Sequence, residues 1–159
     1  VVLLRPGEDG IHQIARALEG ERDLAALHIV SHGADGMLVL GGTTLDSSNL
    51  GKYENELASI GASLAAGGGI LLYGCEVAKS AIGRGFIEEI ARHANANVAA
   101  SNNLTGSAAL GGDWAALGVA LGLTGPSAVA DAETVYNLLT AALAELNGAA
   151  TAAILARLG

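Results

Sequence analysis

Apolar and polar residues follow two periods along the first hundred positions of this chain. Four short, mostly apolar runs have the length of strands: Val1–Leu4, Leu27–Val30, Ile70–Tyr73 and Asn97–Ser101. Between these runs, apolar residues recur at steps of three and four, which is the spacing of a helix with one buried face. A strand–helix alternation of this kind predicts an α/β fold with a parallel sheet and helices on its faces.

The ends of the predicted helices are marked by capping and glycine residues. Asp9 begins the first helix and Gly20 ends it, whereas Asp46 or Ser47 begins the second and Gly67–Gly69 ends it. A third helix is predicted from just after Cys75 to about Asn95. The residues expected to face the core are Ile11, Ile14, Ala15 and Leu18, then Leu50, Tyr53, Leu57, Ile60 and Leu64, then Phe86, Ile87, Ile90, Ala91 and Ala94. Gly41-Gly42, between Met37–Leu40 and Thr43–Leu45, predicts a β-hairpin.

The last third of the chain has a different composition. Residues 102–125 are glycine-rich and irregular, and Gly125-Pro126 marks a break. Helical periodicity returns from Asp131, and a final short helix is predicted around Ile154, Leu155 and Leu158. We therefore expect an α/β domain over residues 1–125 and a helical extension over residues 126–159. The extension would either dock on the sheet or act as an oligomerisation arm.

Composition and charge exclude several classes of function. The chain has 159 residues, 51% of them hydrophobic, and a net charge of −8. With so few basic residues and no basic cluster, we expect no nucleic-acid partner. No apolar run reaches the roughly 20 residues that span a bilayer. Gly67–Gly69 precedes a strand instead of a helix, so it is no phosphate loop, and we expect no cofactor.

Two of the predicted strands end in reactive side chains beside a glycine. One runs into Ser31-His32-Gly33 and the other into Gly74-Cys75, and Cys75 is the only cysteine. Neighbouring parallel strands present functional residues at their carboxyl ends, so His32 and Cys75 would meet there. A histidine beside a thiol is the smallest set of side chains that activates a cysteine as a nucleophile. The competing interpretation is an inert core thiol, because a lone cysteine is usually buried.

The remaining histidines favour structural roles. His28 lies in the middle of a strand, whereas His12 and His93 lie on helices and are expected to be exposed. A zinc site formed by His28, His32 and Cys75 is disfavoured, because four residues of strand span about 13 Å. Two ligands of one metal must each lie about 2 Å from it. We therefore expect no metal site.

The ordered motifs resemble the caspase-like (clan CD) cysteine peptidases. A closer likeness is to an uncharacterised bacterial domain family found in very large surface and adhesin-like proteins. The motifs that carry it are residues 9–14, His28-Ile29-Val30-Ser31-His32-Gly33, Leu71-Leu72-Tyr73-Gly74-Cys75, and Thr105-Gly106 through Gly111-Gly112-Asp113-Trp114. The resemblance covers about residues 1–118. It implies a three-layer sandwich with a mostly parallel central sheet, and an earlier strand–helix unit that this chain does not show.

The resemblance also implies roles for individual residues. Cys75 would attack a peptide carbonyl, His32 would act as acid and base, and the N–H groups of Gly33 and Cys75 would form the oxyanion hole. The glycine beside His32 would leave room for the scissile carbonyl, and a helix starting after Cys75 would favour its thiolate. Tyr73-Gly74-Cys75 replaces the caspase sequence Gln-Ala-Cys, so substrate preference does not carry over. Candidate pocket residues are Asp35, Tyr73, Glu76, Ser101, Asn102, Asn103 and Asp113.

These observations favour a cysteine endopeptidase over two alternatives. An α/β-hydrolase is rejected, because Tyr73 and Val77 stand where the glycines of its nucleophile elbow belong. The rival hypothesis is a caspase-like module that binds or supports other proteins without turnover. The family context predicts a secreted or cell-surface bacterial location and a peptide or protein substrate, which would include the large parent protein itself.

Overall fold

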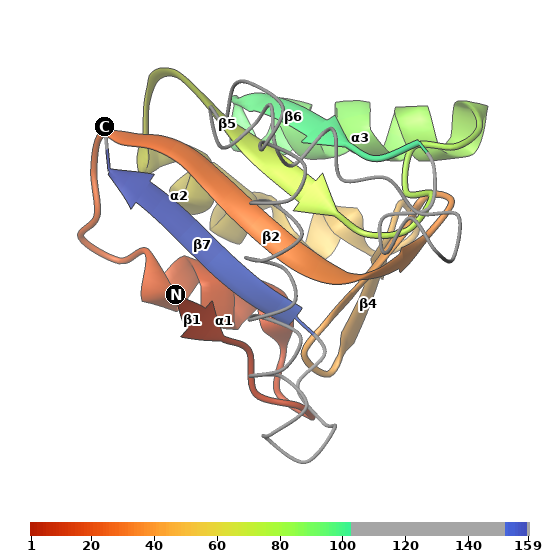
Figure 1. The fold of residues 1–159 in the computed structure, drawn as a ribbon, viewed down its shortest axis with the longest axis horizontal. Helices are drawn as coiled ribbons and strands as arrows, with labels where there is room; N and C mark the ends of the chain where they lie inside the picture. Colours follow the sequence, from red (N-terminus) through yellow and green to blue (C-terminus); the bar gives the residue numbers. More distant parts are fainter. Residues whose placement is uncertain (103–151, 159) are drawn as a thin grey trace, which may run out of the picture.

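A five-stranded mixed sheet organises the protein (Figure 1). The structure is a computed structural model that describes residues 1–102 and 152–158. The strands lie in the order β1 (Val2–Leu3), β7 (Ala152–Leu158), β2 (Leu24–Ala34), β5 (Leu64–Tyr73) and β6 (Asn97–Ala100). Strands β2, β5 and β6 are mutually parallel, whereas β7 runs antiparallel to both β1 and β2. The α/β class is confirmed, but the sheet is mixed where the sequence predicts a mostly parallel one.

A β-hairpin continues from the carboxyl end of β2. Strands β3 (Met37–Leu40) and β4 (Thr43–Asp46) form it, as Gly41-Gly42 predicts, and β3 pairs with residues 32–34 of β2. Gly41 adopts φ +58°, a left-handed conformation that favours glycine. The carboxyl end of β2 is therefore tied to a second, antiparallel set of strands just where His32 lies.

The described helices form one layer on one face of the sheet. They are α1 (Gly10–Ala17), α2 (Glu54–Ala62), which follows the short 3₁₀ helix η1 (Leu50–Tyr53), and α3 (Ala81–Ala94). Helix α1 packs on α2, and α2 packs on α3 (Figure 1). None of the helices within the described ranges is long and apolar enough to cross a membrane. The described residues thus form two layers of the three that the sequence predicts.

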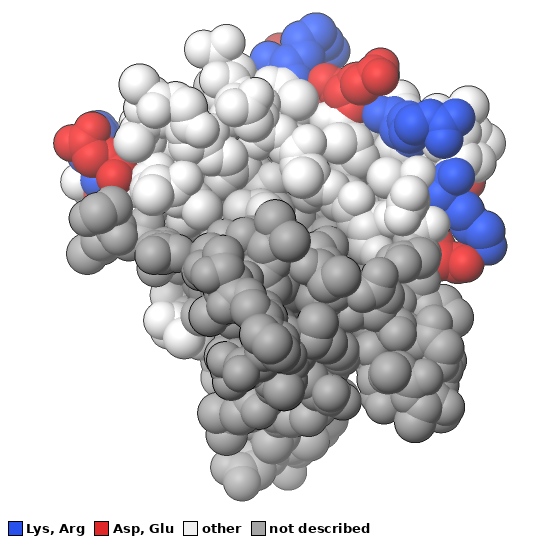
Figure 2. Space-filling model, turned by 45° about the horizontal axis from the view of Figure 1, so that its top comes forward, with Lys and Arg blue, Asp and Glu red and all other residues white. Residues whose placement is uncertain are grey.

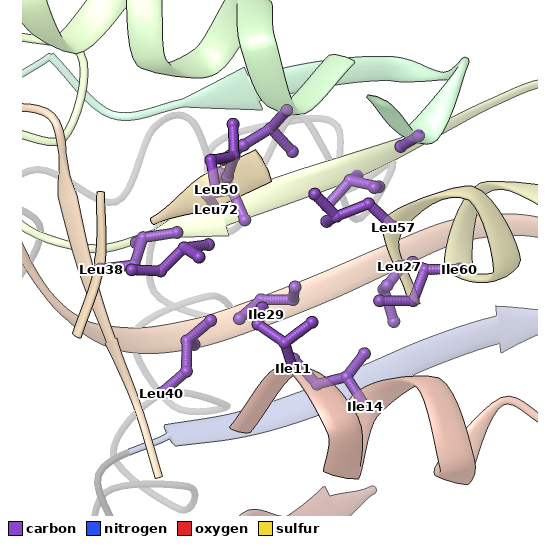
Figure 3. Packing of buried hydrophobic residues seen from close by; sticks show 14 of the residues in the cluster. Ile11, Ile14, Leu27, Ile29, Leu38, Leu40, Leu50, Leu57, Ile60 and Leu72 are labelled. Atoms are coloured by element: carbon purple, nitrogen blue, oxygen red, sulfur yellow. The ribbon is translucent and has the colours of Figure 1, made fainter. Parts of the chain in front are cut away.

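The core lies between this helix layer and the sheet (Figure 3). Alternate residues of the two central strands point into it, Leu27 and Ile29 from β2 and Ile70 and Leu72 from β5. The helices contribute the apolar residues that their periodicity predicts, all buried: Ile11, Ile14, Leu50, Leu57, Ile60, Phe86 and Ile90. Burying a side chain of this kind stabilises the fold by about 1.5–3 kcal/mol.

Three predicted helix boundaries are wrong by several residues. Asp46, predicted with Ser47 to begin the second helix, is the last residue of β4, and helical structure begins with η1, whose N-cap is Asn49. Helix α2 ends at Ala62, and β5 already begins at Leu64, so Gly67–Gly69 lie inside a strand. Helix α3 begins at Ala81 with Ser80 as its N-cap, six positions beyond Cys75. Residues 74–80 form a turn instead. The last two errors arise because pairing within the sheet and the fold of this turn depend on partners that lie far away in the sequence.

The predicted helix around Ile154, Leu155 and Leu158 is also wrong, because these residues lie in β7. Seven residues of β7 pair with β2, from Leu24↔Leu158 to Ser31↔Ala152. Alanine and leucine favour helix locally, but pairing in a sheet overrides such preferences. The predicted helix from Asp131 lies outside the described residues. Strand β1 is confirmed, but as an edge strand in which Val2 is 41% exposed.

Candidate active site at the carboxyl ends of β2 and β5

The register of β2 and β5 carries His32 and Cys75 toward the same edge of the sheet. The last paired residues are Val30 and Tyr73, and the strands are parallel. Continued by two residues, this register would set His32 opposite Cys75, although β5 itself ends at Tyr73 and His32 pairs with Val39 of β3. The backbones remain close there, because a methyl group on Gly33 would lie 3.3 Å from the Cα of Gly74. His32 is exposed and Cys75 is half-buried.

The two glycines of this site are explained by the side chain of Val77. Val77 is completely buried, and its Cγ2 atom would lie 2.6 Å from a methyl group on Gly33 and 2.8 Å from one on Gly74. Contacts below 3.0 Å do not occur for real Cβ atoms. The space beside Gly33 is therefore filled by Val77 and Gly74, whereas a scissile carbonyl was expected to occupy it. The predicted oxyanion-hole roles of Gly33 and Cys75 stay predictions.

Hydrogen bonds to two neighbouring segments hold the turn that follows Cys75. Gly36 N–H donates to the Val77 carbonyl at 2.9 Å, and Ala78 N–H donates to the Ser101 carbonyl at 2.9 Å. At the end of the turn, Ser80 donates twice to the Asp35 carboxylate. The turn is thus fixed to the β2–β3 connection on one side and to the end of β6 on the other.

The carboxylate of Asp35, a predicted pocket residue, accepts hydrogen bonds from the N-cap residue of α3. Its Oδ1 atom accepts from Ser80 N–H at 2.9 Å and its Oδ2 atom from Ser80 Oγ at 2.5 Å. These hydrogen bonds lower the pKa of Asp35 below its ordinary value. The expectation that the dipole of a following helix acts on Cys75 is wrong, because Ser80 and Asp35 occupy that helix terminus.

Tyr73, another predicted pocket residue, forms a buried pair with His28. Tyr73 Oη lies 2.9 Å from His28 Nδ1, and the two rings are nearly parallel, with centroids 5.8 Å apart. His28 is 1% exposed and Tyr73 is 5% exposed, and burial raises the pKa of Tyr73 far above its usual value. Side chains alternate along a strand, so His28 and His32 lie on the same face of β2.

The other predicted pocket residues differ in burial, and two of them lie outside the described residues. Glu76 directly follows Cys75 in a left-handed conformation, φ +57°, and its carboxylate lies 2.6 Å from Lys79 Nζ. Ser101 is buried, and Asn102 is exposed at the end of the described segment. Asn103 and Asp113, with the neighbouring Trp114, lie outside the described residues.

Among the other histidines, His12 is exposed as predicted, but the prediction for His93 is wrong. The His93 side chain is only 8% exposed, and its Nδ1 atom lies 3.6 Å from Glu54 Oε1 across the α2–α3 contact. Within residues 1–102, no three His, Cys, Asp or Glu side chains are close enough to hold a metal ion. The sequence pattern gives no signal for a long-range contact such as the one between His93 and Glu54.

A separate cavity of about 500 Å³ lies at the opposite end of the sheet. Glycine, alanine, one leucine and two asparagines line it, from the ends of α2 and α3 and the first residues of β5. None of these lining residues titrates, so acid–base or nucleophilic chemistry has no side chain there. The reactive groups therefore favour the carboxyl ends of β2 and β5 as the candidate active site, despite the cavity at the opposite end of the sheet.

Charged side chains of both signs lie close together on the described surface. On the face drawn in Figure 2, Lys and Arg side chains lie beside Asp and Glu toward the rim. No continuous basic patch is visible on the described part of this face. A phosphate backbone would need such a patch.

Comparison with known proteins gives one match. The family model described as "Domain of unknown function (DUF4347)" matches residues 1–153. The match continues well past residue 118, where the resemblance is expected to end, and includes the start of β7. No curated protein and no solved structure matches the chain. Since the match covers nearly all of the sequence, the chain belongs to this family, the domain of unknown function DUF4347.

Proposed function

We propose that this protein is a caspase-like cysteine endopeptidase with a Cys75–His32 dyad. The observation that carries the proposal is the parallel register of β2 and β5, which ends at Val30↔Tyr73 and brings both residues to one edge of the sheet. The exposure of His32 and the half-burial of Cys75 support it, because a nucleophile must be reached by substrate.

The proposed reaction proceeds through a thioester. The Cys75 thiolate adds to the peptide carbonyl, and the C–N bond breaks as His32 gives a proton to the leaving amine. Water, deprotonated by His32, then attacks the thioester and releases the acid and the Cys75 thiolate, with His32 again protonated. Backbone N–H groups of Gly33 and Cys75 would bind the developing oxyanion, and losing one such donor typically costs about 10²–10³ in rate.

Cleavage of a peptide library varied at the residue before the scissile bond tests this proposal. The unaltered protein should cleave a subset of the peptides, and Cys75→Ala and His32→Ala should abolish cleavage. His12→Ala is the matched control, because His12 lies on α1 and pairs with Glu56 at 3.3 Å. Cleavage that survives in Cys75→Ala would refute the proposal.

A biological role follows from the resemblance to domains of large bacterial surface proteins. We propose that the domain is exported and cuts its own parent chain or a neighbouring surface protein. Cys75→Ala introduced into the parent should leave it full length in the cell envelope. Normal maturation of that variant would rule out self-processing.

A second candidate is a binding or structural module without turnover. It is favoured by one observation: the helix terminus that would stabilise a Cys75 thiolate is occupied by Asp35 and Ser80. Thiol labelling of the folded protein across pH separates the two candidates. A thiolate next to an imidazolium reacts well below pH 8, and His32→Ala should shift that profile, whereas an inert thiol reacts only on unfolding.

A further inference from the structure

The two segments that carry the proposed dyad are joined by one carboxylate. Asp35 lies in the connection between β2 and β3, shortly after His32, and Ser80 ends the turn that begins after Cys75. Asp35 accepts hydrogen bonds from both Ser80 N–H and Ser80 Oγ. It therefore connects positions 45 residues apart in the sequence.

The residues around Asp35 leave room for its carboxylate and donate hydrogen bonds to it. A methyl group on Gly83, in the first turn of α3, would overlap the Oδ1 atom of Asp35, and the Gly83 backbone also donates to this carboxylate. Beside it, Gly36 N–H donates to the Val77 carbonyl at 2.9 Å. Side-chain and backbone bonds thus join the same two turns at neighbouring points, so their separation is fixed twice.

A second aspartate in the chain shows what a purely local bond of this kind does. Asp46 accepts from Ser48 N–H at 2.8 Å and from Ser48 Oγ at 2.5 Å, the same two kinds of donor as at Asp35, although both bonds go to Oδ1 of Asp46 and to different oxygens of Asp35. Asp46 and Ser48 are only two residues apart, however, so their bonds hold a single turn. The difference between the two aspartates is which segments they connect.

We propose that Asp35 is a positioning residue that sets the separation between His32 and Cys75. Its role in turnover rests on the proposed peptidase function. Its effect on geometry does not. Replacing its carboxylate would weaken one of the two ties and leave the Gly36–Val77 backbone bond to hold the β2–β3 connection to the Cys75 turn, so the two could shift relative to each other. A misplacement of about 1 Å can cost around 10²-fold in rate, while substrate binding elsewhere is unaffected.

The test compares Asp35→Asn with Asp46→Asn in two assays. In peptide cleavage, Asp35→Asn should lower kcat about tenfold or more and leave KM within about twofold, and Asp46→Asn should change neither. In the second assay, His32→Cys is introduced and the rate of its disulfide with Cys75 is measured, since this bond needs Cα atoms about 4.4–6.8 Å apart. Asp35→Asn should slow cross-linking about tenfold, and Asp46→Asn should not.

Each result has a definite meaning. Equal kcat and equal cross-linking in the two variants would overturn the proposal and leave Asp35 a structural residue. Slower cross-linking only in Asp35→Asn, with no peptide cleaved by the unaltered protein, would support the positioning and refute the peptidase. No cross-link in any background would refute the juxtaposition of His32 and Cys75, and with it the positioning role. If Asp35→Asn does not fold, Ser80→Ala, which keeps the Ser80 N–H donor, should give a smaller change in the same direction.

Discussion

Gly33 and Gly74 show how one buried side chain can explain a residue pattern that also suggests chemistry. A glycine beside a histidine or a cysteine is typical of an active site, and this pattern in the sequence indicates His32 and Cys75. In the structure, Val77 occupies the space that a side chain on either glycine would need. The glycines therefore permit the two strand ends to approach each other, and this packing role accounts for both glycines without any chemistry.

Asp9 gives a prediction at the residue scale about stability in acid. Asp9 caps α1 by accepting from His12 N–H at 3.0 Å, and it accepts from Tyr53 Oη at 2.7 Å. Partial burial raises the pKa of Asp9, but the hydrogen bonds from Tyr53 and His12 outweigh it and leave the pKa below 3.8. A lowered pKa in the folded state means that the stabilisation is present above 3.8 and is lost as pH falls through the lower value.

We therefore expect Asp9→Asn to flatten the acid side of the stability profile. The free energy of unfolding, measured by urea denaturation from pH 6 down to pH 2, should fall less steeply in this variant than in the unaltered protein. Glu8→Gln removes the adjacent carboxylate, which caps no helix and pairs with Arg5 on the surface. Its profile should keep the steep fall. Equal slopes in the unaltered protein and Asp9→Asn would contradict the prediction.

At the scale of elements, the sequence predicts best what local chemistry decides. The capping of α1 by Asp9 and the hairpin at Gly41-Gly42 depend on residues within one or two turns, and both are confirmed. The start of β5 and the strand β7 depend on pairing with β2, which no local period reveals. The parallel pairing of β2 and β5 was predictable from the pattern of the strands, but the bond from Ser80 to Asp35 was not.

The contact between α2 and α3 gives a prediction at the same scale. Gly61 lies so close to α3 that a methyl group there would overlap the Ala94 carbonyl oxygen. Since the obstacle is backbone, Gly61→Ala must push the helices apart, and we expect a loss of about 2–3 kcal/mol. Gly85 is the matched control, because a methyl group there meets nothing within 4 Å.

Thermal and urea unfolding of the two variants check this expectation. Gly85→Ala should raise the free energy of unfolding by about 0.5–1 kcal/mol, because alanine favours helix over glycine. Opposite signs for the two substitutions would locate the tight helix crossing at Gly61. A stabilised Gly61→Ala variant would show that the helices are not in contact there.

At the scale of the whole molecule, β7 joins segments from the two ends of the chain in one sheet. It lies between β1 and β2, so the beginning and the end of the sequence meet in one sheet (Figure 1). Contacts of such long sequence separation slow folding, because the loop must close before pairing is gained. They also mean that a domain ending at residue 125, as composition suggests, would leave the β7-facing edge of β2 unpaired.

The pairing of β7 can be measured directly by NMR on the labelled protein. Antiparallel pairing predicts cross-strand contacts between Ile29 and Ile154 and between Leu27 and Ala156, with slow amide exchange in both strands. Ile154→Pro removes an N–H from a strand with neighbours on both sides and should destabilise the protein by about 3 kcal/mol. Ile154→Ala keeps that N–H and should lose less. Sequential helical contacts across residues 152–158, with both variants unfolding alike, would instead return this segment to the helix that its composition predicts.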